Sequence, residues 1–371
     1  LMEIIVNSIV FILLLTAYAT QQGYGYFAQK YDLNAEQLGK ICRQLGKKHK
    51  CQLAKNEMRI WCEENQMMDK INYTFQRFLV KKSMRSGSGV LVCTVTLSPN
   101  KFSCSKNCAM CPQETDLQGN PTQPRSYTSA EPAMLRAMEY DFDVRGQIWD
   151  RIHCYLNTGN IRKDDASSKK LEVILSGGTW ECYPQSERDR FVHECYWAAN
   201  TFGEGQERTI LSLEEEKKIN ETSEYRIIGM TLETRPDFIR KKSIKDYLRY
   251  GVTRIQIGVQ HFDDKILKKI NRGCYTKDTI RAIRLLKQAG LKVVIHLMPD
   301  LPDSSPQLDK WMFQEAITNP DLQFDDIKVY PCAVCHSHDP ENYILKSDLL
   351  TWFQEGSYKP YADQNLSDLV E

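Results

Sequence analysis

The chain has no excess of charge of either sign and no apolar run long enough to span a bilayer comfortably. Its 371 residues carry 49 Lys and Arg against 48 Asp and Glu, a net charge of +1, so no global basic field attracts nucleic acid. Any RNA contact must therefore come from a local basic patch. The most apolar stretch, residues 4–15, has no Lys or Arg before it and is shorter than a membrane helix requires. We expect a packed N-terminal helix there, with a secretory leader, a membrane anchor or an artefact of the gene model as the alternatives.

Paired cysteine spacing is absent from most of the chain, which argues against a secreted disulfide framework. The 13 cysteines are scattered, apart from a cluster at 104–111 and a pair at 332 and 335. We interpret most of them as reduced, buried thiols in a reducing compartment, and we expect a cytoplasmic protein. The length is sufficient for one large domain plus a small one.

Three cysteines stand in the octapeptide Cys104-Ser-Lys-Asn-Cys108-Ala-Met-Cys111, with the spacing C-x3-C-x2-C before Pro112. A short loop of this kind can hold three irons of a cubic [4Fe–4S] cluster and leave the fourth iron open. A structural zinc site or an electron-transfer cluster would need a fourth ligand nearby, and the segment after Pro112 supplies none. The loop resembles that of the radical S-adenosylmethionine (SAM) enzymes and predicts a cluster on Cys104, Cys108 and Cys111. A zinc knuckle and inert thiols are the alternatives.

The second cysteine group is Cys332-Ala-Val-Cys335-His336, followed by His338. It matches the c-type haem attachment pattern, and its two Cys and two His would also suit zinc. Haem attachment needs an oxidising export compartment, which an oxygen-sensitive cluster argues against. We expect ordinary thiols here, with metal binding as the alternative.

The segment before the cysteine loop, residues 30–89, is helical in pattern and locally basic. We take residues 1–88 as a small helical N-terminal domain that ends in a hinge at 86–89. A run of charges is usually a solvated surface, but the recurrence of cations ahead of a catalytic loop favours an RNA-binding face equally. The candidate RNA-binding residues are Lys47, Lys48, Lys50, Arg77, Lys81, Lys82 and Arg85.

Beyond the hinge, apolar runs alternate with amphipathic stretches. Strands are expected at 90–97, 171–175, 226–231, 253–259, 292–297 and 326–330, with helices between them at 187–199, 239–250, 277–288 and 308–317. Such alternation indicates a parallel sheet, and the lack of a dinucleotide fingerprint favours a barrel over a doubly wound sheet. We therefore predict an α/β fold, a partial (β/α)6 TIM-like barrel over residues 89–371, with its cluster loop at 98–112 and its site at the carboxyl ends of the strands.

The second expected strand runs into Ser176-Gly177-Gly178-Thr179. Two glycines at a strand end allow the backbone to approach a ligand closely. In radical SAM enzymes a GG-containing motif at this place holds the amino group of SAM, and Gly177, Gly178 and Thr179 look like that motif. An ordinary tight turn is the alternative.

The next two strands also end in polar residues. Glu233 and Arg235 precede a strand-closing Pro236, and they could bind ribose hydroxyls and a carboxylate or phosphate. A salt-bridged pair at the barrel rim is the alternative. Gln256 in the following strand fits an adenosine pocket, so all three are assigned to the SAM site.

Longer strings over about residues 70–371 resemble one branch of the radical SAM enzymes, the catalytic subunit (subunit 3) of the Elongator complex, which modifies the wobble uridine of tRNA. Generic barrel packing would not require these strings. They are Ser126-Tyr127-Thr128 with Glu131-Pro132, Gly177-Gly178-Thr179, Ser212-Leu213-Glu214-Glu215 with Ile219-Asn220-Glu221-Thr222, Glu233-Thr234-Arg235-Pro236-Asp237, Asn271-Arg272-Gly273 and Met298-Pro299-Asp300-Leu301-Pro302.

The resemblance implies a mechanism and its cofactors. The [4Fe–4S] cluster would cleave SAM to a 5′-deoxyadenosyl radical, which takes a hydrogen from the methyl group of acetyl-CoA, and the carbon radical adds to C5 of uridine 34. Lys170 matches a lysine that the family uses to contact acetyl-CoA, with a surface lysine as the alternative. The basic N-terminal region would hold tRNA through its phosphates. Other Elongator subunits are possible partners.

Two departures from the family are visible. The best-known members have a longer loop between the first two cluster cysteines, so this chain resembles a short-loop variant. The family also continues beyond the position of Ser367-Asp368-Leu369 into an acetyltransferase domain, whereas this chain stops at Glu371. We expect either a fragment or a module that needs the acetyltransferase in trans. A radical SAM enzyme with another substrate and a non-catalytic RNA-binding scaffold remain the alternative functions.

Overall fold

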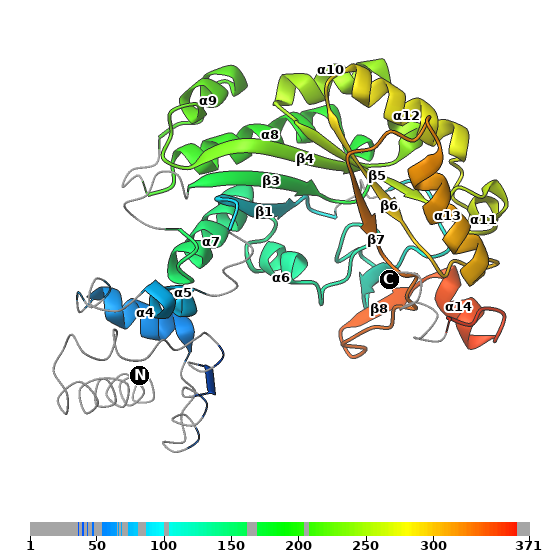
Figure 1. The fold of residues 1–371 in the computed structure, drawn as a ribbon, viewed down its shortest axis with the longest axis horizontal. Helices are drawn as coiled ribbons and strands as arrows, with labels where there is room; N and C mark the ends of the chain where they lie inside the picture. The colour runs from blue at the N-terminus through cyan, green and yellow to red at the C-terminus, as the bar shows by residue number, and fades with distance from the viewer. Residues whose placement is uncertain are drawn as a thin grey trace. The chain divides into compact units, whose positions relative to one another are not determined.

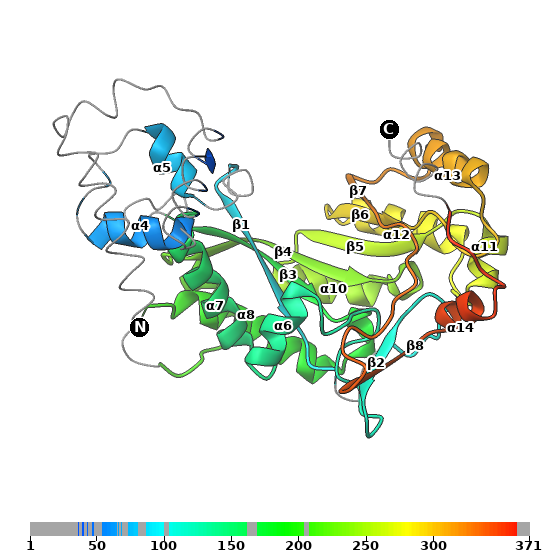
Figure 2. The same ribbon diagram turned by 90° about the horizontal axis from the view of Figure 1, so that it is seen from below.

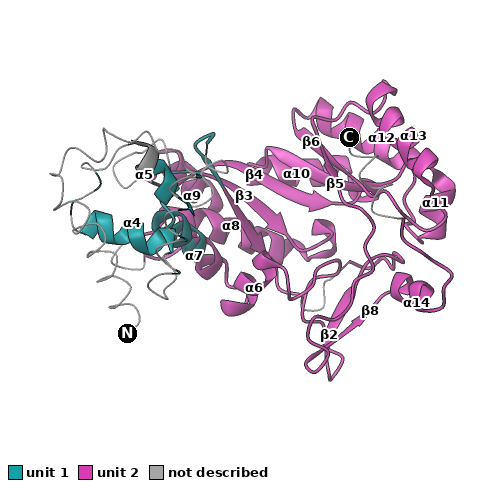
Figure 3. Cartoon of the chain, turned by 60° about the horizontal axis from the view of Figure 1, so that its bottom comes forward, with its two compact units in different colours: residues 1–91, 149–170 teal, residues 92–148, 171–371 magenta. Residues whose placement is uncertain are grey.

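The computed structural model describes residues 87–99, 104–161, 169–203 and 208–361, together with 54–64, 73–80 and residues 36, 39, 40, 43, 47, 66 and 68. The chain divides into two compact units, residues 1–91 with 149–170 and residues 92–148 with 171–371 (Figure 3). The apolar stretch 4–15 lies outside the described residues. Within the described part, no helix is both long and apolar enough to cross a membrane.

The first unit contains two short helices of the N-terminal region, α4 (Lys55–Glu64) and α5 (Tyr73–Leu79). Met58 and Cys62 are buried and stand one turn apart, so α4 has an apolar face. Phe78 and Leu79 are buried at the end of α5. These helices fit the helical pattern of the region.

The second unit is built on a parallel sheet whose strands follow the order β1-β3-β4-β5-β6-β7 among the described residues. Spatial order and chain order agree, as expected when each βα unit is laid beside the last one. The sheet curls into a half-barrel (Figures 1 and 2), which confirms the predicted partial barrel and all six predicted strands. The strands are β1 (Val90–Thr96), β3 (Lys170–Ser176), β4 (Arg226–Thr234), β5 (Arg254–Gln260), β6 (Lys292–Leu297) and β7 (Asp326–Val329).

Helices follow one face of the curved sheet, where α8, α10, α12 and α13 are seen in Figure 1. These four confirm the helices expected from the sequence. Their apolar residues recur at helical spacing, as with Ile244 and Tyr247 in α10, and the left-handed Gly251 (φ 78°) ends that helix. The α-helices that follow β1 along the chain are α6 (Pro132–Glu139), α7 (Val144–Asn157), α8 (Gln185–Asn200), α9 (Leu213–Asn220), α10 (Lys241–Tyr250), α11 (Asp264–Lys269), α12 (Thr276–Gln288), α13 (Pro306–Thr318) and α14 (Asp348–Gln354), with short 3-10 turns at Trp180–Cys182 and Pro236–Phe238. The residues of α7 from Trp149 onward belong to the first unit.

A second, two-stranded sheet was not expected from the sequence. β2 (Gln113–Asp116) directly follows the cysteine loop and pairs antiparallel with β8 (Tyr343–Lys346). β2 has no apolar residue, and β8 has three in a row, so neither four-residue strand has an alternating pattern that can be detected from sequence. The pairing ties the end of the cysteine loop to the chain that follows the last barrel strand.

Candidate active site

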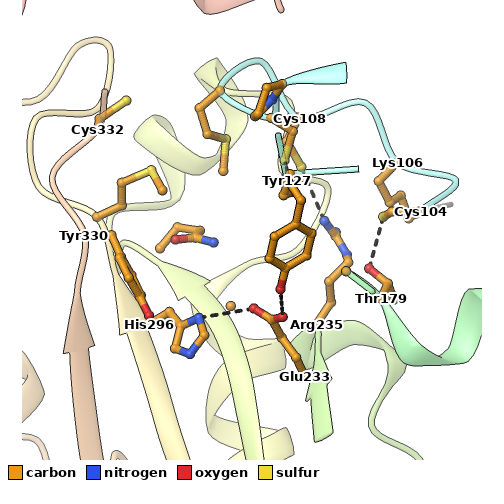
Figure 4. Close-up of a pocket in the computed structure, with 18 of the residues that line it drawn as sticks. Cys104, Lys106, Cys108, Tyr127, Thr179, Glu233, Arg235, His296, Tyr330 and Cys332 are labelled. Atoms are coloured by element: carbon orange, nitrogen blue, oxygen red, sulfur yellow. Dashed lines mark hydrogen bonds and ion pairs between the residues drawn. The ribbon is translucent and has the colours of Figure 1, made fainter. Parts of the chain in front are cut away.

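A pocket of about 460 Å³ opens at the carboxyl ends of the barrel strands. The three cysteines of the predicted cluster line it, and so do the residues at the ends of β3 and β4. Figure 4 shows Cys104 and Cys108 at one side of the pocket and Glu233 and His296 at the other. Of the residues assigned to the site from sequence, it brings together Cys104, Cys108, Cys111, Gly178, Thr179, Glu233 and Arg235.

The cysteine loop is held by its neighbours at both ends. The hydroxyl of Thr179 donates to the sulfur of Cys104 over 3.1 Å, and the hydroxyl of Ser126 lies 3.0 Å from the sulfur of Cys111. Between them, the backbone N–H of Ala109 donates to the carbonyl of Ile270 over 2.9 Å. The glycine turn after β3 and the segment after α11 therefore fix the loop.

Two guanidinium groups face the middle cysteine. Nη1 of Arg235 and Nη1 of Arg272 lie 3.4 and 3.5 Å from the sulfur of Cys108. Arg235 is itself held by Asp237, with Nε to Oδ1 at 2.9 Å, and by the carbonyl oxygen of Arg272 at 2.5 Å. A buried sulfur between two cations is stabilised as a thiolate.

The protonation of the three thiols follows from these contacts. A hydrogen bond from Cys111, then the charges of the two arginines, lower the pKa of Cys108 to about 4. A hydrogen bond from Cys182, then one from Thr179, lower the pKa of Cys104 to about 5 despite burial. Cys111, the donor to Cys108, has a pKa raised well above its ordinary value. Two of the three sulfurs are thus thiolates at neutral pH, the form that binds iron.

The chemistry of this donor set fits an iron–sulfur cluster. Among the described residues no three His, Cys, Asp or Glu side chains surround a single metal ion. A cubic cluster does not require that geometry, because each cysteine binds a different iron. Cationic and hydroxyl donors against the sulfurs also suit an anionic cluster, whose potential depends on such hydrogen bonds.

The glycine turn adopts a backbone that other residues tolerate poorly. Gly177 and Gly178 have φ values of 153° and 83°. A Cβ on Gly178 would lie 3.1 Å from the carbonyl oxygen of Arg125, and one on Gly177 would lie 3.0 Å from the hydroxyl of Tyr183. Glycine is therefore needed for the turn itself, and Thr179 after it reaches the cysteine loop.

Polar side chains from four adjacent strands lie together at the floor of the pocket. The sheet register places Glu233 of β4 beside Gln256 of β5, and His296 of β6 beside Lys328 of β7. Nε2 of His296 lies 2.9 Å from Oε1 of Gln256, which also accepts a hydrogen bond from Nζ of Lys328 over 2.8 Å. Nδ1 of His296 faces Oε1 of Glu233 at 3.8 Å.

Glu233 also accepts a hydrogen bond from Tyr127, whose hydroxyl in turn accepts one from Ser176 over 2.6 Å. Burial raises the pKa of Glu233, against the opposing effects of Tyr127 and Lys328. Burial, together with the charges of Lys328 and Arg272, lowers the pKa of His296 to about 3. His296 is therefore a neutral imidazole at physiological pH.

The other residues assigned from sequence lie elsewhere. Gln256 supports the pocket from below and does not line it, and Gly177 precedes the lining residues. Lys170 is the first residue of β3, at the opposite end of that strand from the glycine turn. Lys47 and Arg77 are exposed. Lys48, Lys50, Lys81, Lys82 and Arg85 lie outside the described residues.

Cys332 and Cys335 line the same pocket. Burial raises the pKa of Cys332 to about 12 and also raises that of Cys335. The ring of His336 packs on Phe353 with centroids 6.3 Å apart, and His338 stacks on Tyr343 at 5.7 Å.

Four residues of the site were not predicted from the sequence: Tyr127, Arg272, His296 and Lys328. Tyr127 and Arg272 belong to strings that carried the family resemblance, so a signal was present for them. His296 and Lys328 sit within apolar strands, where a polar residue on the inner face of the barrel is the only available signal. Their contacts arise from the register between strands, which the sequence does not display.

The half-barrel with a cysteine loop at its strand ends defines a radical SAM protein. A model of the radical SAM superfamily matches residues 102–311, more than half of the chain, and the chain belongs to this superfamily. Membership implies a [4Fe–4S] cluster and SAM as cofactors.

Within the superfamily, the chain is similar to proteins of one group. The chain is 38% identical over 292 residues to the tRNA uridine(34) acetyltransferase of Methanocaldococcus infernus, covering 79% of this chain and 50% of that protein. It is 33% identical over 296 residues to Elongator complex protein 3 of Homo sapiens, covering 79% and 50%. The solved structure of M. infernus Elp3 with an N-terminal deletion has a TM-score of 0.58 at 32% identity, covering 76% of this chain and 53% of that one.

These similarities confirm the resemblance that the strand-end strings predict. The chain spans about half the length of the curated relatives it matches.

Proposed function

We propose that this chain is the radical SAM part of a tRNA-modifying enzyme that activates acetyl-CoA for addition to C5 of the wobble uridine. The observation that carries the proposal is the pocket that joins the three cysteines to the ends of β3 and β4, in a chain similar to tRNA uridine(34) acetyltransferases over 292 residues. Other Elongator subunits, or a separate acetyltransferase module, are the proposed partners, and the N-terminal cations are the proposed tRNA contacts.

The residues of the pocket have distinct parts in this function. Cys104, Cys108 and Cys111 would hold the cluster, and Arg235 and Arg272 would keep Cys108 anionic. When bound, the cluster would supply the electron that splits SAM into methionine and a 5′-deoxyadenosyl radical, and that radical would take a hydrogen atom from the acetyl methyl group to give 5′-deoxyadenosine.

The remaining residues of the site bind and orient the reactants. The Gly177-Gly178-Thr179 backbone would receive the amino-acid end of SAM, and Glu233 would accept hydrogen bonds from the ribose hydroxyls. Lys170 is the proposed contact for acetyl-CoA, because a cation suits the anionic groups of that molecule.

The test is product analysis with tRNA. The reconstituted full chain would be incubated anaerobically with SAM, a reductant, acetyl-CoA and a tRNA transcript, with and without a separate acetyltransferase module. Nucleoside mass spectrometry should find a C5-substituted uridine from position 34, and a transcript with cytidine at that position should give none. Cleavage of SAM that proceeds equally without tRNA and acetyl-CoA would contradict the proposal and favour another radical SAM substrate.

A further inference from the structure

The polar residues at the floor of the pocket determine which nitrogen of His296 carries its hydrogen, and this in turn affects the protonation of Glu233. Oε1 of Gln256 lies within hydrogen-bond distance of both Nζ of Lys328 (2.8 Å) and Nε2 of His296 (2.9 Å). An ammonium group can only donate, so Lys328 requires the oxygen of the Gln256 amide at this place. The amide nitrogen in the same position would set two donors against each other.

The orientation of Gln256 in turn selects the tautomer of His296. Because the oxygen of Gln256 can only accept, Nε2 of His296 must carry the hydrogen. A neutral imidazole has one N–H, so Nδ1 is left with a lone pair. That lone pair faces Oε1 of Glu233 at 3.8 Å, which is longer than a hydrogen bond.

An unprotonated Nδ1 repels a carboxylate, since both are acceptors, and it can accept a hydrogen bond from a carboxylic acid. If Glu233 were ionised, two lone pairs would face each other across the 3.8 Å gap. If Glu233 is protonated at Oε1, its O–H points at the lone pair of Nδ1 and can donate to it when the two atoms move closer than 3.8 Å, while Oε2 still accepts from Tyr127. Protonation of Glu233 thus matches a donor with an acceptor along the whole series Lys328, Gln256, His296 and Glu233.

We propose that Lys328 is a positioning residue which, through Gln256 and His296, keeps a proton on Glu233. The carboxyl group of Glu233 at the floor of the pocket is then uncharged when the ligand binds. This inference rests on the proposed function for the identity of the ligand. A neutral acid accepts hydrogen bonds from hydroxyl groups and does not attract a cation. It would therefore receive the ribose of SAM and leave the ammonium and sulfonium groups to the glycine turn, which orients the molecule in the pocket.

The other charged and titratable groups around the pair do not reverse this balance. The hydrogen bond from Tyr127 and the charge of Lys328 favour an ionised Glu233, yet burial outweighs both and the pKa of Glu233 is raised. Arg272 acts on His296, where it favours the neutral ring. Two further groups, Glu131 and Tyr330, interact with Glu233, and a negative Glu131 disfavours a second negative charge nearby.

The first test reads the tautomer directly. The cluster-free full chain would be labelled with 15N histidine, and the His296 ring would be assigned by comparison with His296→Asn. A long-range 1H–15N spectrum should show a protonated Nε2 and a bare Nδ1 throughout pH 5–8. Lys328→Met should convert this single tautomer into a mixture, Lys328→Arg should preserve it because it keeps the donors, and the exposed Lys346→Met should have no effect. A proton on Nδ1, or an unchanged tautomer in Lys328→Met, would overturn the inference.

The second test asks whether the charge of Glu233 matters for binding. In the reconstituted holoenzyme, Glu233→Gln imitates a neutral acid and should bind SAM within about threefold of the unaltered chain, while Glu233→Leu should bind roughly tenfold or more weakly because buried hydroxyls lose their acceptor. Loss of SAM binding in Glu233→Gln with binding kept in the unaltered chain would show that the ionised form is needed and refute the inference. Failure of the unaltered protein to bind SAM would instead refute the proposed function. The tautomer measurement would still test whether Lys328 acts through Gln256 and His296.

Discussion

Nη1 of Arg272 lies 3.5 Å from the sulfur of Cys108, and the other arm of its guanidinium donates to the carbonyl of Gly258. A Cβ on Gly258 would come within 2.9 Å of Nη2 of Arg272. A glycine inside strand β5 therefore provides the room in which the cation rests. The sheet thus places a positive charge against one of the predicted cluster ligands.

Replacement of that cation should be visible in the reactivity of Cys108. The pKa of Cys108 is lowered to about 4 first by the hydrogen bond from Cys111 and then by Arg272 and Arg235, so Arg272→Gln should move it upward. In the cluster-free protein, the thiolate-dependent alkylation of Cys108 should then begin at higher pH. Cys335, whose pKa burial raises, provides an internal reference whose profile should not move. An unchanged Cys108 profile would mean that Arg272 has no electrostatic role.

Removal of one ligand should abolish cluster assembly. Cys108→Ala leaves two cysteines for three irons, so anaerobic reconstitution should lose the broad visible absorption of the cluster and most of the roughly four irons per chain. Cys154→Ala, a partly exposed thiol in α7, should keep both. Full iron content in Cys108→Ala would remove the basis for the assigned ligand set.

The hydroxyl of Thr179 should tune the cluster. It donates to the sulfur of Cys104 over 3.1 Å, and a donor stabilises the more negative, reduced state. Thr179→Val keeps the shape and removes the donor, so the reduction potential should fall by roughly 20–60 mV, the equivalent of one hydrogen bond. Redox titration followed by electron paramagnetic resonance measures this. Thr318→Val in α13 is the control, and a potential that stays the same would exclude the Thr179 contact in the loaded protein.

Substitution of Lys170 tests whether this residue contacts acetyl-CoA. Lys170→Ala should leave the cluster absorption intact and raise the acetyl-CoA concentration needed for stimulated SAM cleavage roughly tenfold or more, because a charge-assisted hydrogen bond is removed. Lys292, also the first residue of a barrel strand and exposed, is a matched control. Equal responses of the two variants would identify Lys170 as a surface lysine.

The basic N-terminal segment should bind tRNA through phosphates. Reversal of charge in Lys81→Glu with Lys82→Glu should weaken binding to different tRNAs alike, and the slope of log K against log salt should become shallower by about 0.7–0.9 for each phosphate that is no longer neutralised. Lys242→Glu on α10 is the control at an exposed site of the barrel. A salt slope that matches the unaltered chain would exclude these two cations from the interface.

The barrel was predictable because its signals are local. Each strand from β1 to β7 of the large sheet is an apolar run rich in Val and Ile, and the cysteine spacing and glycine pair each occupy a few consecutive residues. The strand pair β2 and β8 joins residues 113–116 to residues 343–346, and no local sequence pattern predicts a pairing between segments so far apart in the chain. The same holds for Lys328 and Glu233, whose side chains are connected through Gln256 and His296 only when β4 to β7 are paired in the sheet.

In the proposed function, the three cysteines form a SAM-cleaving site coupled to tRNA and acetyl-CoA. The direct test is to reconstitute the full chain anaerobically with iron and sulfide and to measure 5′-deoxyadenosine formed from SAM with neither, either or both of tRNA and acetyl-CoA. We expect cluster absorption and a rate of 5′-deoxyadenosine formation that rises when tRNA and acetyl-CoA are both present. A cluster that cleaves no SAM under any of these conditions would contradict it and indicate a non-catalytic RNA-binding protein.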